Sequence, residues 1–195
     1  KSSQARIFEE LLRMLESGSS EMFIDLMHEH RFLELLTPAF AHFLALPEGE
    51  DVLDLLYEVD LRTKDGPIDR ALLLSCLTFP FLQKHIQIHF LDRDKIPHMG
   101  ELLQETQNAI SNVFRPFFLI PRKLRMKMVS ILITQFRMTP YQKQPARKHL
   151  RIPRDPDFPF ALEFLDLRST MEPALKKVWK DWKEAFTNPP HKRAR

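Results

Sequence analysis

The residues best placed to do chemistry in this sequence are cations, and they gather in one stretch of the chain. Residues 106–154 contain 11 Lys and Arg but no Asp or Glu, whereas residues 1–105 contain 10 basic and 19 acidic residues. The chain of 195 residues carries a formal charge of only +3, so the total hides this segregation. Such a one-signed stretch indicates contact with a polyanion, and nucleic acid is the polyanion that we favour.

A predicted helix carries the densest part of this charge. It begins Pro121-Arg122-Lys123-Leu124-Arg125-Met126-Lys127 and places four cations where the helix dipole is already positive. A bound anion would relieve that repulsion and would satisfy the free N–H groups of the first turn. We therefore predict phosphate contacts that tolerate any base sequence and weaken with salt. The predicted contacts are Arg122, Lys123, Arg125, Lys127, Arg137, Lys143, Arg147, Lys148 and Arg151.

Aromatic residues near these cations offer surfaces on which single-stranded bases stack. Phe114, Phe117, Phe118 and Phe136 belong to a predicted helical array, in which we expect phenylalanine to pack in the core. Tyr141 has a polar group and follows a proline in a predicted loop, so it is the better stacking candidate.

The same charge pattern has a second interpretation. The basic residues could form a face that docks an acidic protein, or the chain's own acidic residues 1–105, in a helical protein-interaction module. Cations exposed along one groove would favour nucleic acid, whereas cations paired with carboxylates of residues 1–105 would favour the structural interpretation.

Two histidine pairs have the residue type of a metal site. His85 and His89 are four residues apart, as zinc ligands are on some protease helices, but no Glu lies between them to act as a base. His28 and His30 fall on different sides of a helix. We therefore predict ordinary core or surface histidines and no metal in this chain.

Two Asp-x-Asp pairs have the residue type that metal-dependent nucleotidyl transfer requires. Neither Asp92 and Asp94 nor Asp155 and Asp157 follows a Gly-rich turn at the end of a strand. We predict loop and cap carboxylates, and no catalytic residue, in both places.

The remaining composition excludes several classes. The four glycines are scattered, which excludes a P-loop and a dinucleotide fingerprint. Cys76 is the single cysteine, so there is no intrachain disulfide, which fits a reducing, cytoplasmic compartment. No apolar run approaches the roughly 18–20 residues of a membrane span, so we expect no membrane partner.

Helices must position these groups, because the dominant hydrophobic period is helical and no strand pattern occurs. Residues 68–90 are apolar on nearly every side, which predicts a buried helix, interrupted at Pro80. Five prolines between residues 139 and 159 restrict helices there to short lengths. The fold class is all-α, an irregular multi-helix array. The other predicted helices span 4–16, from 19 or 20 onward, 51–62, 97–114, 121–138, 160–167 and 172–186, and short apolar segments lie at 32–36 and 38–46.

Three stretches, in order, resemble the class II nucleotidyltransferase family of bacterial poly(A) polymerases and CCA-adding enzymes. Residues 3–12, SQARIFEELL, resemble the neck segment of that family. Residues 120–124 and 135–138 are similar to the basic helix of the poly(A) polymerase C-terminal region. Residues 155–158 and 161–168 resemble a later "Pro-x-Phe … Leu-x-x-Leu-Arg" helix. The last two favour the poly(A) polymerase branch, although the tail of a CCA-adding enzyme stays an alternative.

The resemblance implies the neck, body and leg of such an enzyme, without its α/β nucleotidyltransferase head. Residues 1–46 would be a neck-like RNA-binding segment, and residues 47–195 a helical body and basic RNA-binding leg. The whole enzyme would add AMP from ATP to RNA 3′ ends, supporting mRNA polyadenylation and decay. ATP and Mg²⁺ would bind the head, which would also be a partner of this chain, braced through Arg6 and Glu10. The chain alone would bind RNA and catalyse nothing.

Overall fold

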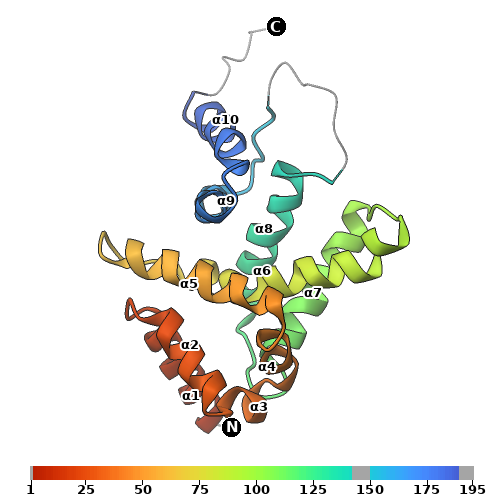
Figure 1. Ribbon diagram of the computed structural model, residues 1–195. Helices are drawn as coiled ribbons and strands as arrows, with labels where there is room; N and C mark the ends of the chain where they lie inside the picture. Colours follow the sequence, from red (N-terminus) through yellow and green to blue (C-terminus); the bar gives the residue numbers. More distant parts are fainter. Residues whose placement is uncertain (1, 142–149, 189–195) are drawn as a thin grey trace, which may run out of the picture.

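The computed structural model describes residues 2–141 and 150–188, and every regular element in them is helical. Helices α1–α4 lie at one end of the molecule, α5–α7 cross its middle, and α9 and α10 lie at the other end (Figure 1). The all-α prediction is therefore confirmed. The helices are α1 (Ser2–Leu15), α2 (Ser20–Glu29), α3 (Phe32–Leu36), α4 (Pro38–Leu44), α5 (Glu50–Thr63), α6 (Arg70–His89), α7 (Met99–Phe114), α8 (Arg122–Met138), α9 (Phe158–Met171) and α10 (Leu175–Thr187), with 3-10 turns at Pro47–Gly49 and Leu91–Arg93.

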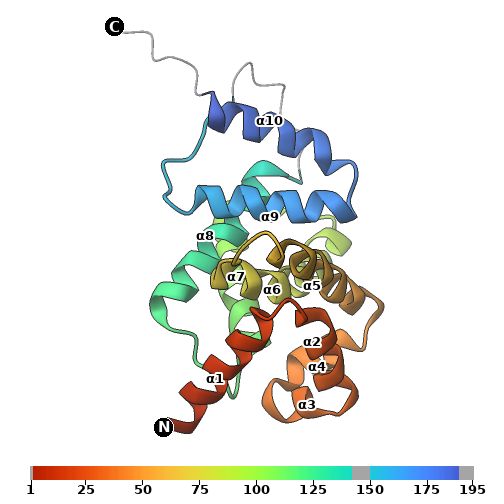
Figure 2. The same cartoon turned by 90° about the vertical axis from the view of Figure 1, so that its left-hand side faces the viewer.

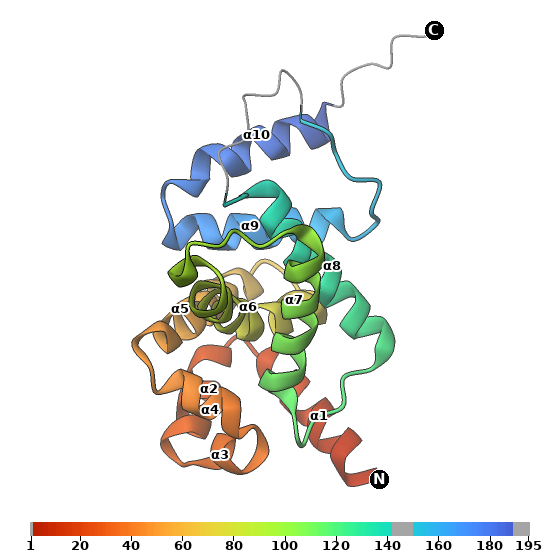
Figure 3. The ribbon, with the colours of Figure 1, turned by 90° about the vertical axis from the view of Figure 1, so that its right-hand side faces the viewer.

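Helix α6 forms the centre of the core, because all of residues 71–82 are buried. It packs against α5, α7 and α8, which bury it from several sides (Figure 3). The predicted interruption at Pro80 is wrong, since α6 continues through that residue to His89. Packing on all sides outweighs the one backbone hydrogen bond that a proline removes. The hydroxyls of Ser75 and Thr78 donate to the carbonyls of Ala71 and Leu74 and satisfy buried polar groups nearby.

Helix α8 is positioned by a buried arginine on the neighbouring helix α9. Arg168 lies over the ring of Phe79 from α6, 4.4 Å from its centroid. Its Nη1 donates to Oε1 of Gln135 on α8, and the Nε2 of Gln135 donates to the carbonyl of Ala161 on α9 at 2.9 Å. Burial lowers the pKa of Arg168, with Glu172 opposing that effect. Three helices are thus joined through one buried polar group.

A second, smaller core joins the last two helices, which run alongside each other in Figure 2. Trp182 of α10 packs against Phe158 at the start of α9, with Met138 from the end of α8 in the same cluster. The described residues between α8 and α9 contain no helix, whereas the prolines had predicted short helices there. This arrangement places the end of α8 beside α10.

The main core extends across the proposed division at residue 46. Phe8 of α1 and Phe43 of α4 belong to the same cluster as Leu56 of α5 and Leu72 of α6. The division into residues 1–46 and 47–195 stays a prediction about function. Among the described helices, none is long and apolar enough to cross a membrane.

Candidate nucleic-acid interface

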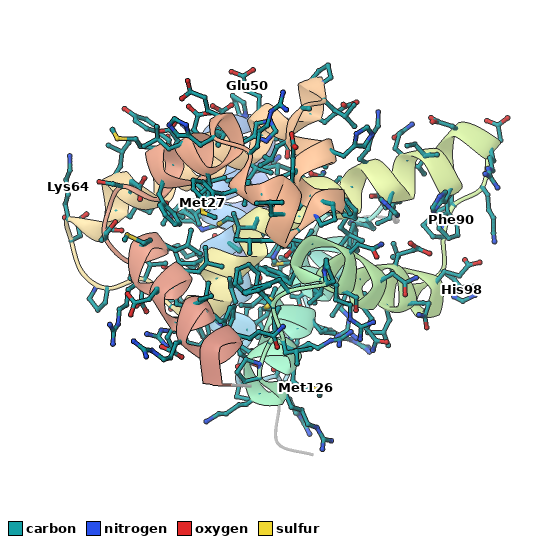
Figure 4. All side chains as sticks on the ribbon, turned by 90° about the horizontal axis from the view of Figure 1, so that it is seen from below. Met27, Glu50, Lys64, Phe90, His98 and Met126 are labelled. Atoms are coloured by element: carbon teal, nitrogen blue, oxygen red, sulfur yellow. The ribbon has the colours of Figure 1, made fainter. Side chains whose placement is uncertain are left out.

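The first turn of α8 exposes cations without a carboxylate beside them. Arg122 and Lys123 are solvent-exposed, and this turn contains no acidic residue and no side-chain cap. Met126, one turn further on, is 62% exposed and marks this end of α8 in Figure 4. Free backbone N–H groups and two exposed cations therefore point at solvent together, which suits an anionic ligand.

Arg125 is held in place by the neighbouring helix α7. Its Nη2 donates to the Oγ of Ser111 at 3.0 Å and to the carbonyl of Gln107 at 3.3 Å. Both acceptors are neutral, so the guanidinium keeps its positive charge while losing some of its freedom. An ordered cation binds phosphate at a smaller entropic cost than a free one.

Lys127 differs from its neighbours because a carboxylate neutralises it. Its Nζ lies 2.7 Å from Oδ2 of Asp69 and 3.2 Å from the centroid of the Phe160 ring. The other oxygen of Asp69 accepts from the N–H of Ala71 and caps α6. Lys127 therefore ties α8 to α6 and α9, and this geometry gives it a structural role that the sequence did not indicate.

The far end of α8 contributes Arg137, which is exposed. Fourteen residues separate it from Lys123, close to four helical turns, so both project from the same side of α8, roughly 20 Å apart. Arg137 lines a pocket of about 570 Å³ together with Arg151 and Tyr141. The structure thus brings the predicted cations together in two groups, one at each end of α8.

The pocket combines the two cations with aromatic surface. Tyr141 stacks on Phe136, with ring centroids 5.8 Å apart and planes 28° from parallel. Burial raises the pKa of Tyr141 to about 12, so its hydroxyl stays a hydrogen-bond donor at neutral pH. Trp182 of α10 and His98 at the start of α7 complete part of the wall. Aromatic rings beside guanidinium groups are suited to bases and phosphates.

The phenylalanines behave as the helical pattern predicts. Phe114, Phe118 and Phe136 are buried in the main core, and Phe117 is partly buried against it. Of the predicted aromatics, Tyr141 is the most exposed, with 37% of the whole residue accessible to solvent.

Several cations of the acidic part of the chain pair with carboxylates of that same part. Arg70 bonds to Glu16 and Glu9, Lys84 to Glu48, and Lys95 to Glu101. In residues 106–154, Lys127 is the single described cation that forms a salt bridge with a described carboxylate. The geometry within the described ranges therefore favours the polyanion interpretation over internal docking. The described cations of this segment are Arg115, Arg122, Lys123, Arg125, Lys127, Arg137, Arg151 and Arg154.

Three predicted phosphate contacts, Lys143, Arg147 and Lys148, lie outside the described residues. The predicted bracing residues Arg6 and Glu10 are both exposed on α1, and Glu10 accepts a hydrogen bond from Arg13 at 3.0 Å. Nothing in the structure tests whether Arg6 and Glu10 contact a head.

Helix α10 carries exposed cations that are not among the predicted phosphate contacts. Lys176, Lys180 and Lys183 are exposed, and their spacing of four and then three residues places them on one face. Lys183 lies over the ring of Trp179, 4.5 Å from its centroid. The helical spacing was visible in the sequence, but three nearby carboxylates balanced the local charge count and concealed it.

The Asp-x-Asp pair at Asp155 and Asp157 is a loop and cap arrangement, as predicted. Asp155 accepts from the hydroxyl of Ser130 at 2.6 Å and from the N–H of Asp157 at 2.9 Å. Asp157 then precedes the first residue of α9. With Asp155 occupied in this way, the pair does not fit a catalytic metal site.

Comparison with protein families gives two matches. Residues 1–44 match a model described as the probable RNA- and SrmB-binding site of polymerase A. Residues 99–195 match a model described as the arginine-rich C-terminus of polymerase A. The second match contains α8, the pocket and α10. No curated protein matches the chain.

Proposed function

The chain belongs to the poly(A) polymerase family, as its RNA-binding C-terminal region, and on that premise we propose that the exposed cations of α8 hold RNA phosphates. Arg122, Lys123 and Arg125 would contact the backbone at one end of the helix, and Arg137 and Arg151 at the other. Lys127 is left out of this set because Asp69 already neutralises it. Lys143, Arg147 and Lys148, outside the described residues, stay proposed contacts.

The observation that carries this proposal is the contrast within one helix. Lys127 has a carboxylate at 2.7 Å, whereas no described carboxylate forms a salt bridge with Arg122, Lys123 or Arg137. Unneutralised cations at a helix N-terminus repel one another unless an anion binds. RNA phosphates supply that anion without requiring a particular base sequence.

The pocket beside Arg137 would take a nucleotide of single-stranded RNA. Tyr141 offers a ring face for stacking, and Arg137 and Arg151 offer charge for the adjoining phosphate. RNA would then run along α8 between the pocket and the first turn of the helix.

For the whole enzyme we propose that a catalytic head adds AMP from ATP to the RNA 3′ end. Mg²⁺ and ATP would bind that head, as the resemblance to the family implies, while Asp155 of this chain accepts hydrogen bonds from Ser130 and from the N–H of Asp157. This chain would hold the body of the RNA and deliver its 3′ end, with Arg6 and Glu10 bracing the head. A cytoplasmic location stays part of the proposal.

The proposal is tested with the triple variant Arg122→Ala, Lys123→Ala, Arg125→Ala. Binding of single-stranded poly(A) RNA is measured over a series of salt concentrations. Loss of three phosphate contacts should lower the slope of log affinity against log salt by about 2, and lower affinity on the order of 100-fold near 0.1 M salt.

The matched control removes three exposed cations from the acidic part of the chain outside residues 1–46, as Lys64→Ala, Arg93→Ala, Lys95→Ala. It changes net charge equally but should leave the salt slope unchanged. Equal loss of affinity in both triple variants would mean that net charge alone attracts the RNA. An unchanged slope in the α8 variant would remove the first turn of α8 from the RNA site.

A further inference from the structure

The histidine pair His85 and His89, predicted above to bind no metal, has a third polar neighbour on the next helix. His85 and His89 lie on the last turns of α6, and Glu105 lies on the second turn of α7. One potential ligand atom from each residue lies within 4.8 Å of the other two. The sequence could not indicate this convergence, because Glu105 lies 16 positions after His89, beyond the connection between the two helices.

The fold brings the three side chains together through the connection between α6 and α7. Figure 4 shows Phe90 and His98, which flank that connection, near one edge of the molecule. His98 caps α7 by accepting from the N–H groups of Gly100 and Glu101, and Glu101 accepts in return from the N–H of His98. This reciprocal cap fixes where α7 starts and hence where Glu105 lies.

The ring of His85 is held in one orientation. It stacks on Phe81, with centroids 4.6 Å apart, and meets the ring of His89 edge-on at 5.1 Å. Its Nδ1 lies 3.9 Å from Oε2 of Glu105. These contacts fix the direction in which its ring nitrogens face His89 and Glu105.

Glu105 is available as a ligand. Its side chain is 17% exposed, and among the described residues no Lys or Arg forms a salt bridge with it. The nearby cations Lys84 and Lys95 are bonded to Glu48 and Glu101 instead. The carboxylate therefore faces two imidazoles without a competing ammonium group.

We propose that His85, His89 and Glu105 bind a Zn²⁺ ion, with water as the fourth ligand. Two imidazoles and one carboxylate form a known donor set for zinc. Tetrahedral bonds of about 2 Å place ligand atoms roughly 3.3 Å apart, so exposed His89 must rotate inward when the ion binds.

The site is a clamp between helices and has no hydrolytic role. Ile86 follows His85 where zinc-dependent proteases carry the Glu that acts as general base. The ion would join the last turns of α6 to α7. Its three ligands are not among the proposed RNA contacts.

The test titrates ZnCl₂ into the whole chain by calorimetry in a buffer that does not chelate metal. We expect one ion per chain, with a thermal midpoint that rises on adding zinc. His89→Gln and Glu105→Gln each remove one ligand with little change in volume and should lower affinity at least about tenfold. His42→Gln, at an exposed histidine of α4, is the matched control and should bind as the parent does.

Each other outcome overturns the site. Unchanged affinity in both ligand variants would place the zinc elsewhere, and loss in His89→Gln alone would show binding to a surface histidine pair without Glu105. Thermal midpoints in excess chelator show that the variants are folded, and a Co²⁺-substituted chain gives a second readout through its visible spectrum. Because RNA affinity is measured separately, failure here leaves the α8 proposal untouched.

Discussion

Residues 1–105 and residues 106–154 use their cations in different ways. In the acidic region, Arg70, Lys84 and Lys95 each bond to a carboxylate of the same region. In the basic region, Arg122, Lys123 and Arg137 are exposed and form no salt bridge with a described carboxylate. The first arrangement joins helices, whereas the second leaves charge available to a ligand.

The position of a cation along the chain therefore does not by itself determine its role. Lys127 belongs to the basic region by sequence but is neutralised like the cations of the acidic region. Arg168, beyond both regions, is buried and bonded to Gln135. Structural cations therefore differ from the proposed RNA-binding cations in their burial and in having a hydrogen-bond or salt-bridge partner within the protein. Mutations can test this difference.

The largest effect on stability is expected at Arg168. Arg168→Ala removes packing on Phe79 and leaves the buried Oε1 of Gln135 without its donor, so we expect a loss of about 3 kcal/mol in the free energy of unfolding. Urea unfolding measures it. RNA affinity should stay within twofold at a temperature where the variant is folded. A stable variant with weakened RNA binding would move Arg168 into the binding set.

The sharpest comparison is between two lysines on the first turns of α8. Lys127→Met breaks the contact with Asp69 and the contact with Phe160, so stability should fall by about 1–2 kcal/mol while RNA affinity changes little. Lys123→Met should leave stability unchanged and lower RNA affinity a few-fold near 0.1 M salt. Urea unfolding and RNA titration of both variants measure the difference. Identical behaviour of the two lysines would remove the distinction on which the RNA site rests.

These two residues show how far the sequence could go. Periodicity predicted the helix from 121 to 138, because a helical face repeats locally, and Met128 and Ile131 are buried on its inner face. It could not separate Lys127 from Lys123, since Asp69 lies 58 residues away in sequence and meets Lys127 only through packing of α6 against α8. The sequence likewise could not show that Glu105 lies close to His89, because the two residues are on different helices. Contacts between distant segments decide function here, and a single sequence does not contain them.

The continuation of α6 through Pro80 has a similar cause. Proline predicts a break from local chemistry alone, because it removes one N–H donor. The helices packed around α6 bury residues on both sides of Pro80 and hold the chain helical. The tendency of Pro80 to break a helix is thus outweighed by the packing of neighbouring helices, which exists only in the folded chain.

Arg70 tests the paired cations of the acidic region. It forms a two-pronged contact with Glu16, at 2.6 and 3.1 Å, and a third bond to Glu9, which join the start of α6 to α1. All three side chains are partly exposed, so Arg70→Met should cost about 1 kcal/mol or less. The loss should shrink in high salt, and RNA affinity should not change. Urea unfolding at low and high salt checks this, with Arg13→Met as the control for an exposed pair within one helix.

The smallest effect comes from carboxylates that the acidic region leaves without cations. Burial, then Asp54 and Glu172, raise the pKa of Asp51. A carboxyl group whose pKa is raised on folding favours the folded state when protonated, and that contribution is lost as pH rises through the folded pKa. Asp51→Asn should therefore stabilise the chain at pH 7 by a few tenths of a kcal/mol after solvent screening.

The gain from Asp51→Asn should fade as pH falls toward the ordinary aspartate pKa of about 4 and vanish about one unit below it, where the carboxyl group is protonated in both states. Urea unfolding of parent and variant at pH 7 and about pH 3 measures it, with Asp65→Asn as the control. A gain that persisted at low pH would have a cause other than charge. Stabilisation confined to neutral pH would show that the acidic region carries surplus charge of its own, which the cations of residues 106–154 do not relieve.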